Sequence, residues 1–170
     1  SKRSLMSIEG EPFDGLRVRT TNDLRVDLVN APATLTPGVA NEVQLRLTNN
    51  GNGDVTALLD LPDIPSTWSW WMTVEGQNAS DGVDLSVSYD LQHQKNVSAW
   101  ILLPSMEAAG ERHTIAVQVE NKGADDDASP GDNRIEFVTR TDAVRLPSAS
   151  LVSQTTSTMA GGTMMAEAQV

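Results

Sequence analysis

Short runs in which apolar and polar residues alternate constrain the fold of this chain most. Val43, Leu45 and Leu47 are apolar while Gln44 and Arg46 lie between them, and this period of two is typical of a β-strand with one buried face. The same period recurs at residues 24–28, 55–61, 83–89, 97–103, 115–119 and 135–137. Turn formers rich in Gly, Asn, Asp and Pro separate the runs. The pattern predicts an all-β fold, an antiparallel sandwich of two sheets.

The chain length fits one such domain with extensions at both ends. Of the 170 residues, 39% are hydrophobic, a proportion typical of a globular domain. We expect the sandwich to occupy residues 24–146, after an N-terminal extension or strand at 1–23. Residues 147–170 are rich in Ser, Thr, Ala, Gly and Met, and this composition is typical of a flexible tail.

Charge and composition exclude several classes of function. The formal net charge is −11, so nucleic-acid phosphates would be repelled. The absence of cysteine excludes disulfides and thiolate chemistry. No apolar run is long enough to span a bilayer.

Two glycosylation sequons favour an extracellular or cell-surface location. Asn78 begins Asn-Ala-Ser in a polar loop where a sugar would fit, and Asn96 begins Asn-Val-Ser at the start of a predicted strand. Chance occurrence is the alternative for both. We therefore treat the protein as a candidate glycoprotein.

The order of strands and breaks resembles a known group of modules. A strand ending in Asn49-Asn50-Gly51-Asn52-Gly53, a second strand leading to Leu61-Pro62 and Trp68, and later breaks at Pro104 and Gly110 carry the resemblance. It is similar to the immunoglobulin-like NEW3 and CARDB-type modules of archaeal and bacterial surface proteins, over about residues 24–139. The resemblance implies an immunoglobulin-like sandwich that serves as a spacer, an adhesive element, a carbohydrate-associated accessory or a structural subunit.

The two ends depart from this family pattern and suggest assembly. Residues 11–23 resemble 129–142, because both contain a Pro-x-Asp turn, a short alternating strand and a Thr-x-x-Asp exit. Such echoes occur in tandem arrays, and chance similarity is the alternative. An orphan terminal strand needs a partner, so we expect self-association into a homo-oligomer or a filament by donor-strand exchange. A carbohydrate-binding or spacer module of a larger surface protein is the alternative.

Large apolar residues outside the regular pattern are candidate interface residues. Three tryptophans lie within four positions, and the alternation places one of them on the opposite face from the other two. Core or subunit packing is one interpretation, and a glycan platform is the other. The candidates are Trp68, Trp70, Trp71, Trp100, Met159, Met164 and Met165.

An oxygen-rich loop is a candidate calcium site. Asp125, Asp126, Asp127 and Asp132 lie close together in the sequence, and calcium takes six to eight oxygen ligands, often from such loops. The spacing does not match an EF-hand, and a solvated acidic loop is the alternative.

Catalytic motifs are lacking. His93 and His113 are the only histidines, and neither has a second His or Cys at metal-binding spacing. Neither a nucleophile elbow nor a phosphate-binding glycine loop is present. The sequence therefore predicts a protein that is not an enzyme, with calcium as its one candidate cofactor.

Overall fold

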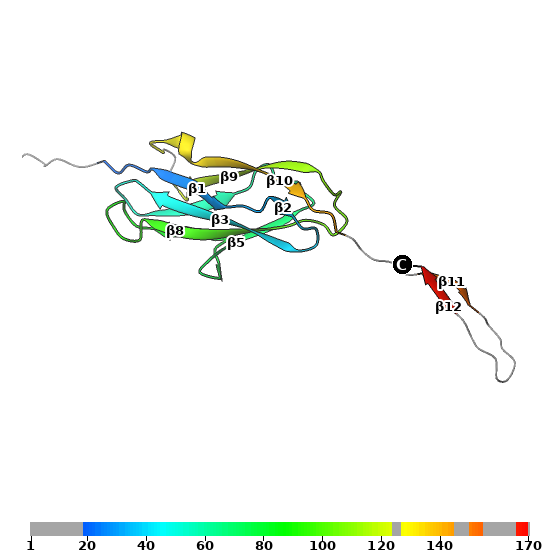
Figure 1. The fold of residues 1–170 in the computed structure, drawn as a ribbon. Coiled ribbons are helices and arrows are strands. Elements are labelled where there is room, and N and C mark those ends of the chain that lie inside the picture. Colours follow the sequence, from blue (N-terminus) through cyan, green and yellow to red (C-terminus); the bar gives the residue numbers. More distant parts are fainter. Residues whose placement is uncertain (1–18, 124–126, 145–149, 155–165, 170) are drawn as a thin grey trace, which may run out of the picture.

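The computed structural model describes residues 19–123, 127–144, 150–154 and 166–169 as two stacked sheets and a separate hairpin (Figure 1). One sheet has the order β1 (Leu24–Asn30), β3 (Ala40–Asn49), β8 (Gln94–Leu102), β5 (Ser69–Val74), β6 (Gln77–Asn78). The other has the order β2 (Thr34–Leu35), β10 (Arg134–Thr141), β9 (Arg112–Asn121), β4 (Val55–Asp60), β7 (Val83–Leu85). A 3-10 turn, η1 (Pro130–Asp132), precedes β10.

This strand order confirms the predicted immunoglobulin-like sandwich. The order β1-β3-β8-β5 corresponds to the A-B-E-D sheet of an immunoglobulin domain, and β10-β9-β4 corresponds to the G-F-C sheet. β2 adds to the second sheet by pairing parallel with the end of β10, whereas the other strand pairs of the described residues are antiparallel. The sandwich therefore extends from β1 to β10.

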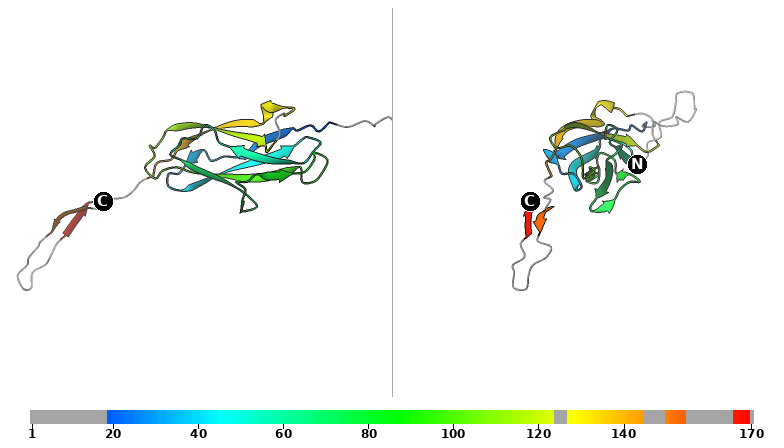
Figure 2. Two further views of the ribbon diagram at one scale, coloured as in Figure 1. Left: turned by 180° about the vertical axis from the view of Figure 1, so that it is seen from behind. Right: turned by 90° about the vertical axis from the view of Figure 1, so that its right-hand side faces the viewer.

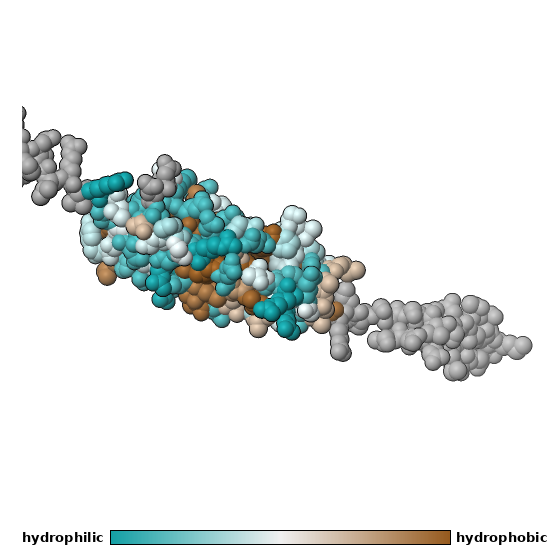
Figure 3. All heavy atoms as spheres, turned by 90° about the horizontal axis from the view of Figure 1, so that it is seen from above, coloured by the Kyte–Doolittle hydropathy of each residue, from teal (hydrophilic) through white to brown (hydrophobic). Residues whose placement is uncertain are grey.

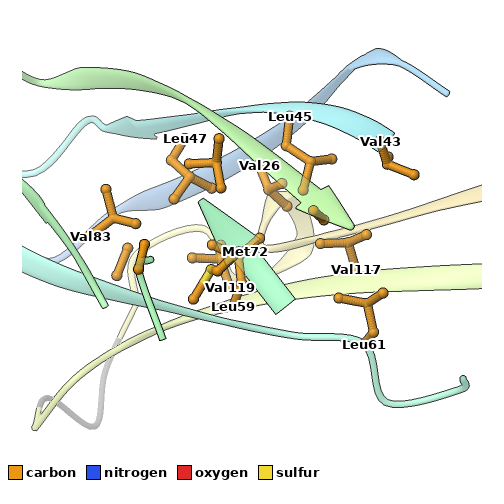
Figure 4. Packing of buried hydrophobic residues seen from close by; sticks show 14 of the residues in the cluster. Val26, Val43, Leu45, Leu47, Leu59, Leu61, Met72, Val83, Val117 and Val119 are labelled. Atoms are coloured by element: carbon orange, nitrogen blue, oxygen red, sulfur yellow. The ribbon is translucent and has the colours of Figure 1, made fainter. Parts of the chain in front are cut away.

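The alternating apolar residues fill the space between the sheets. Leu45 and Leu47 of β3 and Val117 and Val119 of β9 are fully buried, and they point toward one another from opposite sheets (Figure 4). Burying a side chain of this size stabilises the fold by roughly 1.5–3 kcal/mol relative to leaving it exposed. The core thus explains why the period-two runs occur where they do.

One predicted strand is wrong over half of its length. The run 83–89 forms a strand only over Val83–Leu85, because its partner β4 begins at Val55, opposite Leu85. Beyond that point the backbone turns, with the Ser86 N–H donating to Gln92 O at 3.2 Å. The alternation of Val87 and Tyr89 is therefore accidental, and Tyr89 is 85% exposed.

The Asn-Gly-rich turn after β3 depends on a buried side chain. Asn49 is fully buried. Its Nδ2 donates to Gly53 O and to Ser86 O, both at 2.8 Å, and its Oδ1 accepts from the Gly51 N–H at 2.9 Å. The three bonds satisfy backbone groups that this turn would otherwise leave unpaired inside the fold.

The C-terminal hairpin is a sheet of its own. β11 (Ser150–Gln154) and β12 (Ala166–Gln169) pair antiparallel with each other, and within the described residues neither strand pairs with the sandwich. The views of Figures 1 and 2 agree that the hairpin lies apart from the two stacked sheets. Among the described residues, no helix is long and apolar enough to cross a membrane.

Candidate cation site and aromatic surface

Three aspartates from distant parts of the sequence meet at the start of β1. Asp23 immediately precedes β1, Asp127 forms a parallel bridge with Asn22, and Asp132 ends η1. Each of the three carboxylates offers an oxygen that lies within 4.8 Å of the other two. The arrangement is a carboxylate cluster that is compatible with a bound metal ion.

Backbone hydrogen bonds hold the cluster in place. Asp127 Oδ2 accepts from the Leu24 N–H at 2.8 Å, and its Oδ1 accepts from the Ser129 N–H at 2.8 Å. The Ala128 N–H donates to Asn22 O at 2.8 Å, and the Asp132 N–H donates to Ser129 O at 3.1 Å. Asp127 is thus fixed between the entry of β1 and the turn that leads into β10.

Burial and mutual repulsion disfavour the simultaneous ionisation of all three carboxylates in the absence of a cation. The pKa of Asp23 is raised first by burial and then by the negative charges of Asp132 and Asp127, and a hydrogen bond with Ser129 lowers it in part. The Oδ1 atoms of Asp23, Asp132 and Asn133 are buried without a hydrogen-bond partner. A bound cation would satisfy such oxygens and offset the repulsion.

The candidate ligands differ from those predicted from the sequence. The structure brings Asp127 and Asp132 together, while Asp125 and Asp126 lie outside the described residues, so the metal site of these four residues stays a prediction. Asp23 is the member that the sequence prediction missed, because about a hundred residues separate it from Asp127. The only sequence signal for Asp23 is its place at the end of the Thr-x-x-Asp echo, and that echo indicates tandem repetition rather than a metal site.

The tryptophans divide between the core and the outer surface. Trp68 is only 5% exposed. Its ring lies edge-to-face against the His113 ring, with the two ring centroids 4.7 Å apart, and its Nε1 donates to Glu107 Oε2 at 3.2 Å. Trp70 is half-buried against the same core. Trp68 therefore cannot serve as a surface anchor in this fold, and Trp70 is only partly accessible.

Trp71 and Trp100 form a stacked pair on the outer face of the β3-β8-β5 sheet. They face each other across β5 and β8, and their rings are nearly parallel, with an interplanar angle of 11° and centroids 6.3 Å apart. Trp100 Nε1 donates to Thr73 Oγ1 at 3.0 Å. Trp71 is 38% exposed, so the pair presents aromatic surface to solvent.

The remaining predicted site residues are either exposed on strands or lie outside the described residues. Asn78 in β6 and Asn96 in β8 are both exposed; whether either is glycosylated stays a prediction. Met159, Met164 and Met165 lie outside the described residues, as do residues 1–18 of the predicted N-terminal extension. The proposed relation between residues 11–23 and 129–142 therefore also stays a prediction.

Solved structures similar to this chain share its sandwich at low sequence identity. A CARDB domain from Pyrococcus furiosus matches in a solution NMR structure, with 14% identity, a TM-score of 0.43 and coverage of 73% of this chain and 98% of that one. Its crystal structure in complex with di-metal ions matches with 15% identity, a TM-score of 0.43 and coverage of 77% and 99%.

Two further solved structures come from different functional classes. AvmM, which catalyses macrocyclization in alchivemycin A biosynthesis, matches with 14% identity, a TM-score of 0.44 and coverage of 74% of this chain and 92% of that one. The SrpA adhesin of Streptococcus sanguinis matches with 14% identity, a TM-score of 0.38 and coverage of 71% and 58%.

The comparisons bear on the fold alone. No protein-family model matches the sequence, and no curated protein matches it. The predicted resemblance to CARDB-type modules agrees with these two CARDB structures as a likeness of fold. The immunoglobulin-like sandwich itself follows from the strand order.

Proposed function

We propose that this chain is a non-enzymatic structural domain of an extracellular or cell-surface protein, and that it assembles with copies of itself by adding its terminal β-structure to a neighbour's sheet. The observation that carries the proposal is the β11–β12 hairpin, a two-stranded sheet that pairs with no other strand in the described part of the chain. An isolated two-stranded hairpin is marginally stable in water. A further strand from another copy would stabilise it.

The outer edge of β10 is the edge best suited to receive the hairpin. The Arg140 N–H donates to Ala33 O at 3.2 Å and the Asp142 N–H donates to Leu35 O at 2.8 Å, so β2 covers only the last residues of β10. Backbone groups alternate sides along a strand, so the N–H groups of Glu136 and Val138 face the same edge beyond the end of β2. No described strand pairs with them there.

The other edges are less suitable. On β1 the Leu24 N–H is bound by Asp127, and the pairing with β3 is irregular between Leu28 and Asn30. Such bulges protect an edge against pairing. β6 and β7 have two and three residues, which is too short for the five residues of β11.

Apolar side chains are exposed on the two edge strands β1 and β10. Leu28 is 39% exposed, Val29 48% and Val138 47%. Figure 3 shows apolar atoms gathered near the middle of the face that is seen from above in the orientation of Figure 1. An added strand would cover some of this area.

Because the hairpin and the edge are different surfaces, the contact is heterologous, and repeated contacts produce a filament rather than a closed dimer.

The assembly is tested on the full-length chain by electron microscopy and light scattering. Val138→Pro removes an N–H on the open edge of β10 without touching the bonds to β9, and proline is tolerated at such positions. We expect this variant to stay monomeric. The matched variant Val138→Ala keeps the N–H, so it should assemble like the original protein.

A second variant tests the donor. Removal of residues 147–170 should abolish polymers while circular dichroism retains the β signal of the sandwich. A monomer in every sample, the unmodified chain included, contradicts the proposal, as does assembly that survives both Val138→Pro and the truncation.

The aspartate cluster supports calcium as the cation of this domain, and we include it in the proposal. Three carboxylates offer oxygen ligands within 4.8 Å of one another, as calcium prefers. Calcium would tie the entry of β1 to the turn before β10 and so stiffen the N-terminal junction of the sandwich.

Thermal unfolding with and without calcium tests this site. Binding to the native state alone should raise the stability by about 2.7 kcal/mol at a hundred times the dissociation constant. Asp23→Asn should reduce this gain, whereas Asp81→Asn, which removes the same charge from an exposed residue outside the cluster, should not. An equal response of both variants would assign the effect to general screening of the acidic surface.

A further inference from the structure

The outer face of the β3-β8-β5 sheet carries a groove next to the stacked tryptophans. The groove has a volume of about 350 Å³. Its polar lining consists of Gln44, Thr73, Glu75, Asn96 and Ser98. Within the sheet, Thr73 and Gln44 both lie opposite Ser98, one row along from the Trp71 and Trp100 pair. Two residues along a strand correspond to about 7 Å, so the aromatic surface and the groove are contiguous.

We propose that this face binds a neutral polysaccharide, with a sugar ring stacked on Trp71 and the next part of the chain in the groove. The C–H faces of a sugar ring pack on flat aromatic surfaces, while its hydroxyl groups need hydrogen-bond partners at the sides. A site of this kind combines apolar area with a few placed polar groups. The proposal is independent of assembly at β10, which belongs to the other sheet.

The aromatic part of the site is held in place before any ligand binds. The bond from Trp100 Nε1 to Thr73 Oγ1 fixes one ring, and the parallel stack fixes Trp71 against it. A rigid aromatic surface loses little conformational freedom on binding. Trp71 is also among the few large apolar residues that this face exposes.

The polar part of the site offers both donors and acceptors. Thr73 Oγ1 accepts from Trp100, so its own proton is available to a ligand. Ser98 Oγ donates to Glu42 Oε1 at 2.6 Å, so its lone pairs can accept. The side-chain amides of Gln44 and Asn96 carry both functions. Sugar hydroxyls, which donate and accept at the same atom, match this mixture.

Charge selects neutral over anionic chains. Glu75 lines the groove, Glu42 lies beside it, and the whole protein has a net charge of −11. A uronic-acid or sulfated polysaccharide would meet repulsion here.

Two sources could supply a saccharide to this groove: a glycan attached to the protein itself and a separate polysaccharide chain. Asn96 lines the groove and begins a sequon, so a glycan attached to it would fill the same space. We propose a separate polysaccharide chain as the ligand. Protein produced in a host without N-glycosylation, with its unmodified mass verified, therefore presents the open site.

Affinity gel electrophoresis of the full-length chain tests the proposal with mannan, galactan and mixed-linkage β-glucan as neutral probes and polygalacturonate as the anionic probe. We expect at least one neutral probe to retard the protein and polygalacturonate to have no effect. Trp71→Ala should weaken binding by about tenfold or more, as for an aromatic anchor. Tyr89→Ala removes a more exposed aromatic from the turn after β7 and should leave binding unchanged.

The stability of each variant is checked by thermal unfolding, and Trp71→Phe provides a second, milder substitution that should retain part of the affinity. The proposal is overturned if no neutral probe retards the protein, if only polygalacturonate does, or if Trp71→Ala binds as tightly as the original. Protein from its natural source that carries a glycan on Asn96 would also overturn it. Trp71→Ala leaves β10 and the hairpin intact, so failure of sugar binding and failure of assembly are distinguishable.

Discussion

Asp127 accepts a hydrogen bond from the backbone N–H of Leu24 at 2.8 Å, across 103 positions of sequence. The bond satisfies the first outward-facing N–H of β1 and ties the entry of the sandwich to the segment before β10. The same residue belongs to the aspartate cluster. Asp127 therefore both supports β1 and contributes one carboxylate to the candidate cation site.

Replacement of Asp127 tests its structural role. Asp127→Ala leaves the N–H groups of Leu24 and Ser129 without their acceptor, and we expect a loss of about 1–3 kcal/mol in the free energy of unfolding. Asp127→Asn keeps one acceptor oxygen and should cost less. Urea denaturation measures both. Equal stability of the two variants and the original protein would show that the bond contributes nothing.

Asp23 makes the stability of the calcium-free protein depend on pH. Its folded-state pKa is raised above the ordinary value of 3.8 by burial and by the charges of Asp132 and Asp127, so the folded state holds its proton more tightly than the unfolded state. The stabilisation from this proton is fully present below about pH 3.8 and is lost as the pH rises through the raised value.

The substitution Asp23→Asn removes this dependence. We expect the variant to be more stable than the original at neutral pH without calcium, and the difference should shrink as the solution is acidified toward the unfolded pKa. Thermal unfolding at a series of pH values provides the measurement. A constant difference at every pH would exclude the titration of Asp23 as its cause.

Asn49 is expected to be the most sensitive polar residue of the sandwich. Asn49→Ala would leave Gly53 O, Ser86 O and the Gly51 N–H without their partner, at a cost of at least about 2 kcal/mol. The neighbouring Asn50 is exposed, so Asn50→Ala should change stability by no more than about 0.5 kcal/mol. Chemical denaturation compares the pair, and similar losses would show that the turn does not depend on the buried amide.

The core predicts a clear contrast between two leucines. Leu45 is fully buried between the sheets, whereas Leu91 is 98% exposed. Leu45→Ala should cost about 2–5 kcal/mol through lost burial and a cavity, and Leu91→Ala should cost less than about 0.5 kcal/mol. Comparable unfolding midpoints for the two variants would be inconsistent with this core.

Local patterns were sufficient for most strands of the sandwich. The runs around Leu45, Val97 and Val117 became strands with the predicted buried faces, because alternation along a strand determines which side chains face a core. The alternation also placed Trp71 opposite Trp68 correctly. It failed at Tyr89, where the side chains alternate but no strand of the described residues pairs with the backbone.

The candidate sites depended on the tertiary structure. The sandwich, the acidity and the two aspartates Asp127 and Asp132, which lie near each other along the chain, could all be predicted without the tertiary structure. Only the pairing of strands brought Asp23 to them and placed Trp71 beside Trp100. These contacts join residues separated by tens of positions, and no local periodicity encodes such distances. They follow from sheet order and register, which the packing of the whole core decides.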